Sequence, residues 1–240
     1  MKATWKLLGV AILVLTAGIS CSATTIMDQI GGDPYDVSSG NVYASQQFES
    51  SMNTYDAAVI DDFTVSSANT LLTGVDAVLT GWNGFDSSKW ANITGWRVEI
   101  YDNDVSVSYN LNGNAASQHF APSEVSLDTN YVTDNPEYAL VSIPVEIMLG
   151  NPGTYYIGVI PIMDFTGNGQ LGISKSTNFG SNPGGMNAWQ ANPGGGFALT
   201  EGSLNADAAY RIEAAPVPEP SSLLVLGMGL VPFLAYRRRK

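Results

Sequence analysis

Very few side chains in this chain of 240 residues belong to the types that perform covalent chemistry. His119 is the single histidine and Cys21 is the single cysteine. A nucleophile–histidine–acid triad would have to use His119, and no serine lies in a recognisable nucleophile motif. One histidine and one cysteine also fall short of a usual zinc site. We therefore interpret His119 as a loop or packing residue and expect no catalytic residues.

Carboxylates are the other side chains that could do chemistry. A glycosidase needs two carboxyl groups placed across a sugar bond. Glu99, Glu146 and Glu213 fall in predicted strands, but the sequence does not show whether any two of them face each other. We expect these three acids on solvated faces of a sheet, and a secreted hydrolase stays open as an alternative.

Calcium is the one metal that the composition favours, since it binds carboxylate and carbonyl oxygens. Asp102 and Asp104 are the predicted ligands, although the loop lacks the glycine and the distal glutamate of an EF-hand. The alternative is that these aspartates turn the chain, and that Asp61 and Asp62 put charge on an exposed strand edge. No other cofactor is expected.

Three tryptophans are candidates for carbohydrate contact. Trp82, Trp90 and Trp189 lie in or near segments rich in Gly, Asn and Ser. Flat indole rings offer apolar faces on which a sugar can stack, but most tryptophans are core or loop anchors. A lectin-like module therefore competes with a purely structural role for these residues.

The charge distribution argues against nucleic acid as a partner. Between residues 24 and 215 the basic residues are Lys89, Arg97, Lys175 and Arg211, against 21 of the 22 acidic residues, which gives this part a charge of about −17. Such a field repels phosphate backbones.

The elements that must position these residues are predicted to be strands. In Gly95–Tyr101, Trp96, Val98 and Ile100 alternate with Arg97 and Glu99, the period of a half-buried strand. The same reading gives strands at Ala57–Val65, Val75–Leu79, Ala139–Ile147, Thr154–Ile162, Gln170–Ser176 and Ala208–Ala214. About eight short strands joined by polar turns predict one all-β domain, a β-sandwich of jelly-roll type.

Turn chemistry refines this prediction. The segment 150–153, Gly-Asn-Pro-Gly, predicts a hairpin between 139–147 and 154–162. Pro144 and Pro161 lack the N–H of a ladder and are expected at an edge or a bulge. Long loops are expected at 102–135 and at 178–202, the second pinned by Trp189 and Phe197.

The N-terminal segment has the pattern of an export signal. Lys2 and Lys6 precede an apolar run from Leu7 to Leu15 and small residues up to Ala23, as in a signal peptide helix. We place the signal at 1–23. Lipidation of Cys21 is the alternative, but Gly18 occupies the position where lipoprotein signals usually carry leucine.

The C-terminal segment, 216–240, is a short apolar stretch between a polar motif and a basic cluster. Pro218-Glu219-Pro220 precedes an apolar run from Leu223 to Tyr236, and Arg237, Arg238, Arg239 and Lys240 follow it. From Ser221 to Tyr236 a helix would be about 24 Å long, short of a hydrocarbon core of about 30 Å. The basic cluster is expected on the cytoplasmic side.

These features closely resemble the PEP-CTERM sorting domain of Gram-negative bacteria. The resemblance covers about the last 24 residues and includes Pro218, Glu219 and Pro220, the apolar helix with Gly227 and Gly229, and the arginine cluster. It implies processing by an exosortase, a transient stage in the inner membrane, and a surface or biofilm setting rich in exopolysaccharide. An ordinary C-terminal membrane anchor is the alternative.

The region 24–215 also resembles a domain that recurs among PEP-CTERM proteins. The resemblance rests on the segments 60–65, 95–101, 153–158 and 207–212, and it implies kinship and fold, not chemistry. We therefore expect a non-catalytic surface or matrix protein, with a calcium-dependent or calcium-independent lectin-like module and a secreted hydrolase as the alternatives.

Overall fold

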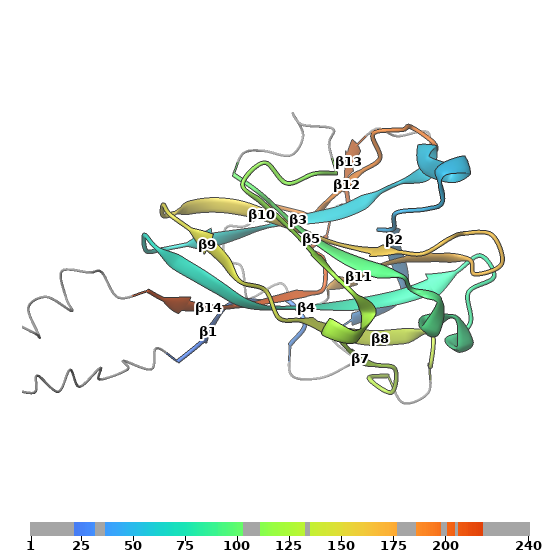
Figure 1. Cartoon of the computed structure of the whole chain (residues 1–240), viewed down its shortest axis with the longest axis horizontal. Coiled ribbons are helices and arrows are strands. Elements are labelled where there is room, and N and C mark those ends of the chain that lie inside the picture. The colour runs from blue at the N-terminus through green and yellow to red at the C-terminus, as the bar shows by residue number, and fades with distance from the viewer. Residues whose placement is uncertain are drawn as a thin grey trace, which may run out of the picture.

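The computed structural model describes residues 22–31, 37–102, 111–132, 135–176, 186–197, 201–204 and 206–217. These residues form two antiparallel sheets, drawn as two layers in Figure 1. Residues 1–21 of the predicted export signal, which include Cys21, lie outside the described residues, as do Asp104 and the residues of the sorting motif from Pro218 onward. Within the part of the chain that the structure describes, no helix is long and apolar enough to span a membrane.

The first sheet has eight strands arranged around one long central strand. Its members are β1 (Thr24–Asp28), β2 (Val37–Ala44), β4 (Thr70–Trp82), β7 (Ser126–Asp128), β8 (Tyr138–Ile143), β9 (Ile147–Leu149), β11 (Gln170–Ser176) and β14 (Tyr210–Pro216). Along one edge of β4 lie β14 and then β11, and along the other edge lie β9 and then β8. β4 therefore runs the whole length of this sheet.

The second sheet has six strands in the order β13-β12-β3-β10-β5-β6. Its members are β3 (Ala58–Val65), β5 (Gly95–Tyr101), β6 (Ala116–Phe120), β10 (Gly153–Ile162), β12 (Trp189–Ala191) and β13 (Glu201–Ser203). Three short 3-10 helices complete the described elements: η2 (Ser50–Tyr55), η3 (Ser87–Asn92) and η5 (Pro122–Glu124).

One hydrophobic cluster joins the two sheets. Trp96, Val98 and Ile100 of β5 belong to it together with Leu72 and Leu79 of β4. The alternation in 95–101 therefore predicted the strand and its core-facing side correctly. The prediction that the strand is half-buried is wrong, because all seven residues of β5 are buried. The strands predicted at 154–162 and 170–176 are confirmed as β10 and β11.

The predicted hairpin between 139–147 and 154–162 is wrong. β8 and β9 pair with β4 in the first sheet, whereas β10 pairs with β3 and β5 in the second. The turn after Leu149 therefore carries the chain from one sheet to the other. Turn residues fix a change of direction but not the strand that the chain pairs with next.

Several acids predicted at solvated positions are buried. Asp61 and Asp62 lie in β3, between β12 and β10, and are not on an exposed edge. Glu99 of β5 is fully buried. Glu146 and Glu213 are exposed, as predicted. Asp61, Asp62 and Glu99 can be buried because they have hydrogen-bond or ion-pair partners, which strand periodicity cannot reveal.

The predicted loops contain further short strands. The segment 102–135 includes β6, η5 and β7, and 178–202 includes β12 and part of β13. His119 is exposed on β6, an edge strand opposite Arg97. β1 and β2 were not predicted. Of these six strands, only β2 is longer than five residues, and the other five are too short to show a period.

The two prolines lie where a ladder is interrupted. Pro144 separates β8 from β9. Pro161 of β10 pairs with β5. On its other side the pairing of β10 with β3 has already ended, at Gly158↔Ile60, and the Pro161 carbonyl accepts from Gln47 N at 2.9 Å. Both positions fit the prediction that neither residue donates to a ladder.

β3 and β10 separate just where the next pair, Val59 and Val159, would form. Two hydroxyl groups fill the gap. Tyr210 Oη donates to Val59 O at 2.8 Å and accepts from Val159 N at 3.3 Å. Ser45 Oγ donates to Val159 O at 2.6 Å and accepts from Val59 N at 3.3 Å. The separation lets the segment around Gln46 pass beside β3, where it pairs with Ala57.

Candidate functional site

A groove lies at the end of the body where β4 finishes and β11 begins. Trp82 and Gln170 are paired at this end. Three neighbouring depressions share lining residues: a first of about 290 Å³, a second of about 320 Å³ and a third of about 620 Å³. Asn83, Gln170 and Phe197 line the first and second, and Trp82 lines the second and third. We call the three depressions together the end groove.

The lining of the end groove is aromatic and amide-rich. Met52, Tyr55 and Phe165 complete most of the first depression, Tyr43 and Gln190 contribute to the second, and Asn135, Glu137 and Tyr138 contribute to the third. Two ring pairs stiffen the first depression: Phe48 with Phe165 at 6.2 Å and Tyr55 with Phe197 at 5.4 Å between centroids, both edge to face.

One wall of the end groove is tied by the Glu49 carboxylate. It accepts from Phe165 N at 2.6 Å, from Thr166 N at 3.2 Å and from Thr166 Oγ1 at 2.7 Å. The hydroxyl bond of Thr166 is the main cause that lowers the pKa of Glu49. The carboxylate thus joins the start of η2 to the segment that precedes β11.

The opposite wall is tied by the Asn192 amide. Its Nδ2 donates to Thr54 O at 3.0 Å and to Asp56 O at 2.8 Å, while its Oδ1 accepts from Phe197 N at 3.0 Å. Gly196 is required here, because a Cβ on it would lie 2.6 Å from Thr54 O. Asn192 therefore places the Phe197 ring against Tyr55.

The floor of the end groove depends on a tight approach of two turns. Gly169 has φ +85, and a Cβ on it would lie 2.3 Å from Phe85 N. Both its backbone conformation and the available space favour glycine. Across from it, Asn83 adopts φ 54 at the tip of the turn that follows β4, a conformation that asparagine tolerates better than most residues.

Two amides meet at the centre of the groove. Asn83 Nδ2 donates to Gln170 Oε1 at 2.9 Å. Gln170 is only 4 % exposed, and among the described residues its Nε2 has no hydrogen-bond acceptor. Gln170 lines the first and second depressions, and its Nε2 is not among the fully buried atoms without a partner. A donor with solvent contact is therefore left at the groove, where a ligand could accept from it.

The three predicted carbohydrate tryptophans do not come together. Trp82 is half-buried in the end groove. Trp90 is buried in the core, with Nε1 donating to Pro136 O at 3.0 Å, and is therefore a core anchor and not a surface contact. Trp189 is half-buried on β12, where strand alternation directs it away from the side that carries Gln190.

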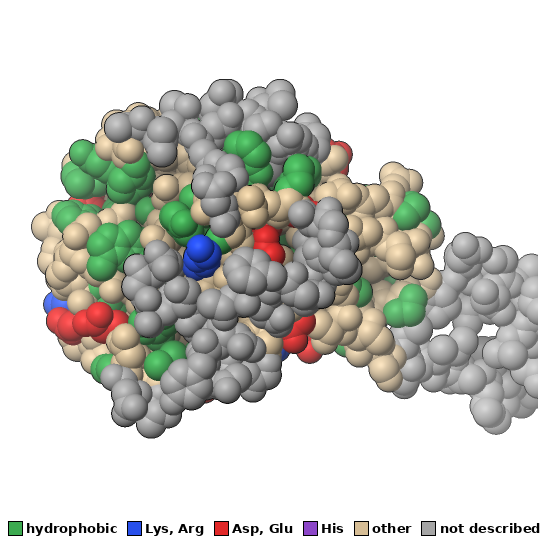
Figure 2. Space-filling view, turned by 180° about the vertical axis from the view of Figure 1, so that it is seen from behind, with side chains coloured by type: hydrophobic (Ala, Val, Ile, Leu, Met, Phe, Trp, Pro, Cys, Tyr) green, Lys and Arg blue, Asp and Glu red, His purple; other side chains and the backbone are tan. Residues whose placement is uncertain are grey.

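The groove residues that the sequence did not single out are mainly Asn83, Gln170 and Tyr55. A usable signal was present in Trp82-Asn83-Gly84, which places an aromatic residue beside a turn amide. Figure 2, which views the molecule from behind, shows hydrophobic side chains at the surface on the left, as well as near the top and on the right. The left of this view is the right of Figure 1. This is the end at which η2, η3 and the β10–β11 turn lie in Figure 1.

The predicted calcium ligands are only partly described. Asp102 is exposed, its Oδ1 accepts from Asn114 Nδ2 at 2.6 Å, and its backbone N donates to Asn114 Oδ1 at 3.1 Å. The two contacts tie Asp102 to Asn114, twelve residues further along the chain, and are not a local turn of the Asx type. Over the described residues, no group of three or more His, Cys, Asp or Glu side chains could hold a metal ion.

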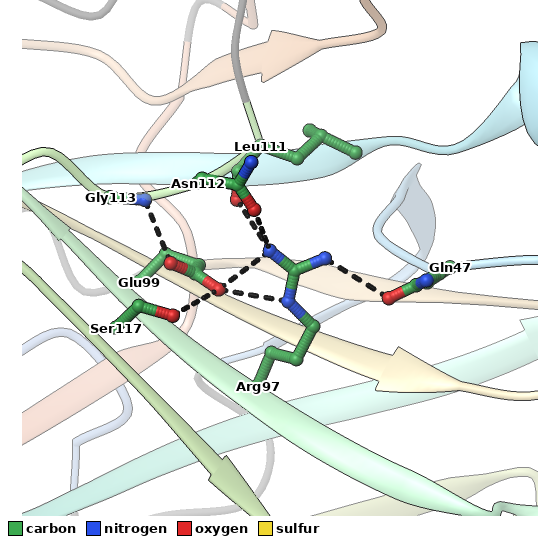
Figure 3. Close-up of polar contacts among 7 residues, drawn as sticks. All are labelled: Gln47, Arg97, Glu99, Leu111, Asn112, Gly113 and Ser117. Atoms are coloured by element: carbon green, nitrogen blue, oxygen red, sulfur yellow. Dashed lines mark hydrogen bonds and ion pairs between the residues drawn. The ribbon is translucent and has the colours of Figure 1, made fainter.

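A second polar cluster lies on the outer side of the second sheet, around Arg97 and Glu99 of β5 (Figure 3). Arg97 Nη2 lies 2.7 Å from Glu99 Oε1, and the two side chains are 8 % and 0 % exposed. Gln47 Oε1 accepts from Arg97 Nη1 at 3.0 Å. Asn112 Oδ1 accepts from Nη2 at 2.7 Å.

The remaining contacts of Glu99 pin the segment before β6. Glu99 Oε2 accepts from Gly113 N at 2.7 Å, Glu99 Oε1 accepts from Ser117 Oγ at 3.0 Å, and Arg97 Nη2 donates to Leu111 O at 3.1 Å. Every charged oxygen and most guanidinium N–H groups are thereby satisfied by protein. The arrangement suits a structural clamp, since neither charge faces open space.

Comparison with known proteins identifies one part of the chain. No curated protein and no solved structure matches the chain. The family model of the PEP-CTERM protein-sorting motif matches residues 216–240, the segment that the Pro-Glu-Pro motif, apolar run and arginine cluster predicted. The chain therefore carries a PEP-CTERM protein-sorting motif, which marks it as an exosortase-targeted, secreted surface protein with a membrane-associated stage.

Proposed function

We propose that this protein is a non-catalytic surface component that is exported by a Gram-negative bacterium and sorted through Pro218, Glu219 and Pro220. Its body, a β-sandwich of jelly-roll type in this proposal, is presented to the exopolysaccharide layer. The observation that carries the proposal is the placement of the chain ends: β1 begins and β14 ends side by side, with Thr24 paired to Ala214, at the end of the body opposite the end groove (Figure 1).

The distance between the two ends follows from β4. Thr70 pairs with Pro216, the residue at which the sorting motif starts, and Trp82 pairs with Gln170 in the groove. At about 3.3 Å per residue, the 13 residues of this strand separate the two sites by roughly 40 Å. A body held at the membrane by residues 218–240 would therefore direct the end groove outward.

The non-catalytic part of the proposal is supported by the environment of Glu99. Glu99 was a candidate hydrolase carboxylate, and it is fully buried and paired with Arg97. Glu146 and Glu213 are exposed on the first sheet side, Glu213 in β14 and Glu146 just before β9. Glu213 lines a depression of about 500 Å³ together with Asp76 and Glu124, but Asp76 is paired with Arg211 at 3.3 Å, and neither Glu99 nor Glu146 lines this depression. The three predicted acids therefore do not form a pair that faces across one cleft.

The sorting role is tested by replacing Pro218, Glu219 and Pro220 with alanines in the full chain. We expect the variant to accumulate in the inner membrane, because the apolar stretch and Arg237–Arg239 remain while the recognition element is gone. Cell fractionation and surface proteolysis measure the distribution.

The matched control replaces Ser221 and Ser222 with alanine, which changes the same segment but spares the motif. It should be sorted as the natural chain is. If the Pro-Glu-Pro variant reaches the surface as fast as the natural chain does, the proposal is contradicted. Pro218, Glu219 and Pro220 would then not be needed for sorting.

Calcium binding through Asp102 and Asp104 remains a separate proposal. The negative charge of the body favours a divalent ion, which would stabilise the folded state by mass action. The expected result is a saturable rise in melting temperature at constant sodium that magnesium does not reproduce. The double variant Asp102→Asn/Asp104→Asn should lose it, and an equal rise in both proteins would return these residues to turn formation.

A further inference from the structure

The end groove has the polarity of a site for an uncharged, hydroxyl-rich ligand. Its ring faces come from Trp82, Tyr55 and Phe197, and its amides from Asn83, Gln170 and Gln190. Of the described residues that line the first and second depressions, none carries a charge. A phosphate or uronate would need cationic partners and a metal ion would need carboxylates.

The charge of the whole body points the same way. Between residues 24 and 215 it carries about −17, which repels anionic polymers. The charged groups at the end groove are carboxylates. Glu137 lines the third depression, and Glu49, in one wall, already accepts three hydrogen bonds from Phe165 and Thr166. An acidic polysaccharide would therefore meet repulsion without a compensating partner.

Gln170 is the observation that distinguishes the groove from a merely apolar depression. It is 4 % exposed, it lines both the first and second depressions, and within the described structure its Nε2 has no acceptor. Nε2 is not among the fully buried polar atoms without a partner, so it keeps contact with solvent in the groove, where a ligand hydroxyl can accept from it. Asn83 Nδ2 holds Gln170 Oε1 at 2.9 Å, and Asn83 lines the same two depressions.

The walls are already ordered before any ligand arrives. Glu49 fixes Phe165 and Thr166, and Asn192 fixes Phe197 against Thr54. A ligand that binds to ordered side chains loses less of its binding free energy to their immobilisation. Rings in fixed positions are also what stacking against a flat ligand face requires.

We propose that the end groove binds a neutral polysaccharide. The C–H faces of its sugar rings pack on Trp82 and Phe197, and its hydroxyls, each both donor and acceptor, bond to the amides of Asn83 and Gln170. The proposal names the ligand class for the surface role proposed above and in that sense rests on it, but its test is made on purified protein and does not depend on sorting.

The test is affinity electrophoresis of the full chain in lauryldimethylamine oxide, a detergent without a sugar headgroup. Native gels contain dextran, soluble xylan, galactomannan or hydroxyethylcellulose as neutral probes, and alginate as the anionic probe. The variants are Trp82→Ala, Phe197→Ala and Asn83→Gly, the last of which keeps the backbone conformation that φ 54 requires. Trp189→Ala is the matched control, since this tryptophan is equally half-buried but lies away from the groove.

We expect at least one neutral polysaccharide to retard the natural chain. Trp82→Ala and Phe197→Ala should each raise the dissociation constant by roughly tenfold, and Asn83→Gly by several-fold, with unchanged circular dichroism and melting temperature. Trp189→Ala should bind as the natural chain does.

Four outcomes would overturn the proposal: no retardation by any neutral probe, retardation by alginate alone, equal retardation of all variants, or loss of binding in Trp189→Ala only. If a groove variant is destabilised, the comparison rests on the other two. Correct sorting combined with no retardation would refute the groove site and leave the surface role intact.

Discussion

At the scale of single residues, the buried acids behave differently from what their sequence neighbours suggest. Asp61 is 0 % exposed and sits in β3 facing the space between the sheets. Its Oδ1 accepts from Asp62 N at 2.9 Å and its Oδ2 from Ala208 N at 2.7 Å. With its amide oriented to donate, Gln29 Nε2 also lies 2.9 Å from Asp61 Oδ2. Asp61 thus joins three segments that are far apart in the sequence.

This environment predicts a pH dependence of stability. Burial raises the pKa of Asp61 well above its usual value of 3.8, and the nearby Asp207 and Asp62 add to the increase against the opposing hydrogen bond from Ala208. An acid whose pKa is higher when folded binds its proton more readily in the folded state. The free energy of unfolding should therefore rise as the pH falls through the folded-state pKa of Asp61 toward 3.8.

Urea denaturation at pH 7.5 and pH 5 checks this direction. The natural chain should be more stable at pH 5, and Asp61→Asn should lose much of the difference, because its amide does not titrate. Some dependence should remain, since burial also raises the pKa values of Asp56 and Asp207. A natural chain that is less stable at pH 5 would contradict this account of Asp61.

The Arg97–Glu99 pair gives a second prediction at this scale. Glu99→Gln removes one charge and leaves Arg97 buried without compensation, so we expect a loss of about 3–5 kcal/mol in the free energy of unfolding. The double replacement Arg97→Met/Glu99→Leu should recover only part of it, because Leu111 O and Gly113 N then lose their partners. Urea denaturation measures both.

The control for the ion pair is Asp76→Asn. Asp76 lies 3.3 Å from Arg211, which also pairs with Asp28 at 3.3 Å, and these side chains are 21–36 % exposed. Its loss should cost about 0–1 kcal/mol. Equal losses in Glu99→Gln and Asp76→Asn would show that the buried cluster is not the clamp described here.

At the scale of elements, the separation of β3 from β10 is the feature on which the groove end depends. Tyr210 and Ser45 replace two backbone hydrogen bonds with hydroxyl bridges between Val59 and Val159. The segment around Gln46 uses the space, and its side chain accepts from Leu171 N at 2.6 Å, one residue after Gln170. The open ladder therefore helps to hold the β11 side of the groove.

Tyr210→Phe tests this bridge. Removal of one hydroxyl leaves Val59 O and Val159 N buried without a partner, so the free energy of unfolding should fall by about 1–3 kcal/mol. Tyr155→Phe is the control, since Tyr155 Oη donates to the carbonyl of the exposed Asn151 at 3.0 Å and its loss should cost less. Equal costs in urea denaturation would mean that water replaces the Tyr210 hydroxyl.

The existence of most of the longer strands was predictable from the sequence, although β2, with eight residues, was missed. Strand pairing was not predictable. β5, β10 and β11 have enough alternating apolar residues for a period of 2 to be visible. β1, β6, β7 and β12 have five residues or fewer and are fixed by their neighbours. The hairpin prediction failed because the turn at 150–153 connects two sheets and not two neighbouring strands.

The candidate site was predictable in part, for a similar reason. Trp82 was identified by residue type, and it lies in the groove. Trp90 has the same type and a similar polar setting, but its indole is in the core. Gln170 and Phe197 meet Trp82 only because β4, β11 and the Asn192 turn converge at one end, which residue spacing does not encode.

At the scale of the whole molecule, the last strand of the body, β14, ends before Pro218, Glu219 and Pro220 of the sorting motif begin. β14 lies between β1 and β4 and ends at Pro216, and Val217 N donates to Asn69 O at 3.1 Å. Processing at Pro218, Glu219 or Pro220 would leave every pair of β14 in place. The sequence-derived boundary at Ala215 falls two residues earlier, within this last set of contacts.

The last prediction is that the body folds without either terminal segment. A fragment of residues 24–217 should give a β-rich circular dichroism spectrum, unfold cooperatively and be unaffected by reductant, because Cys21 lies outside it. A fragment of 24–215 should fold too, with a stability lower by about 0.5–1.5 kcal/mol for the lost contacts of Pro216 and Val217. A fragment of 24–209, which lacks β14, should fail to fold, since β1 and one edge of β4 lose their partner. A helical spectrum for 24–217, or cooperative unfolding of 24–209, would contradict the assignment of β14 as the strand that closes the body before the sorting motif begins.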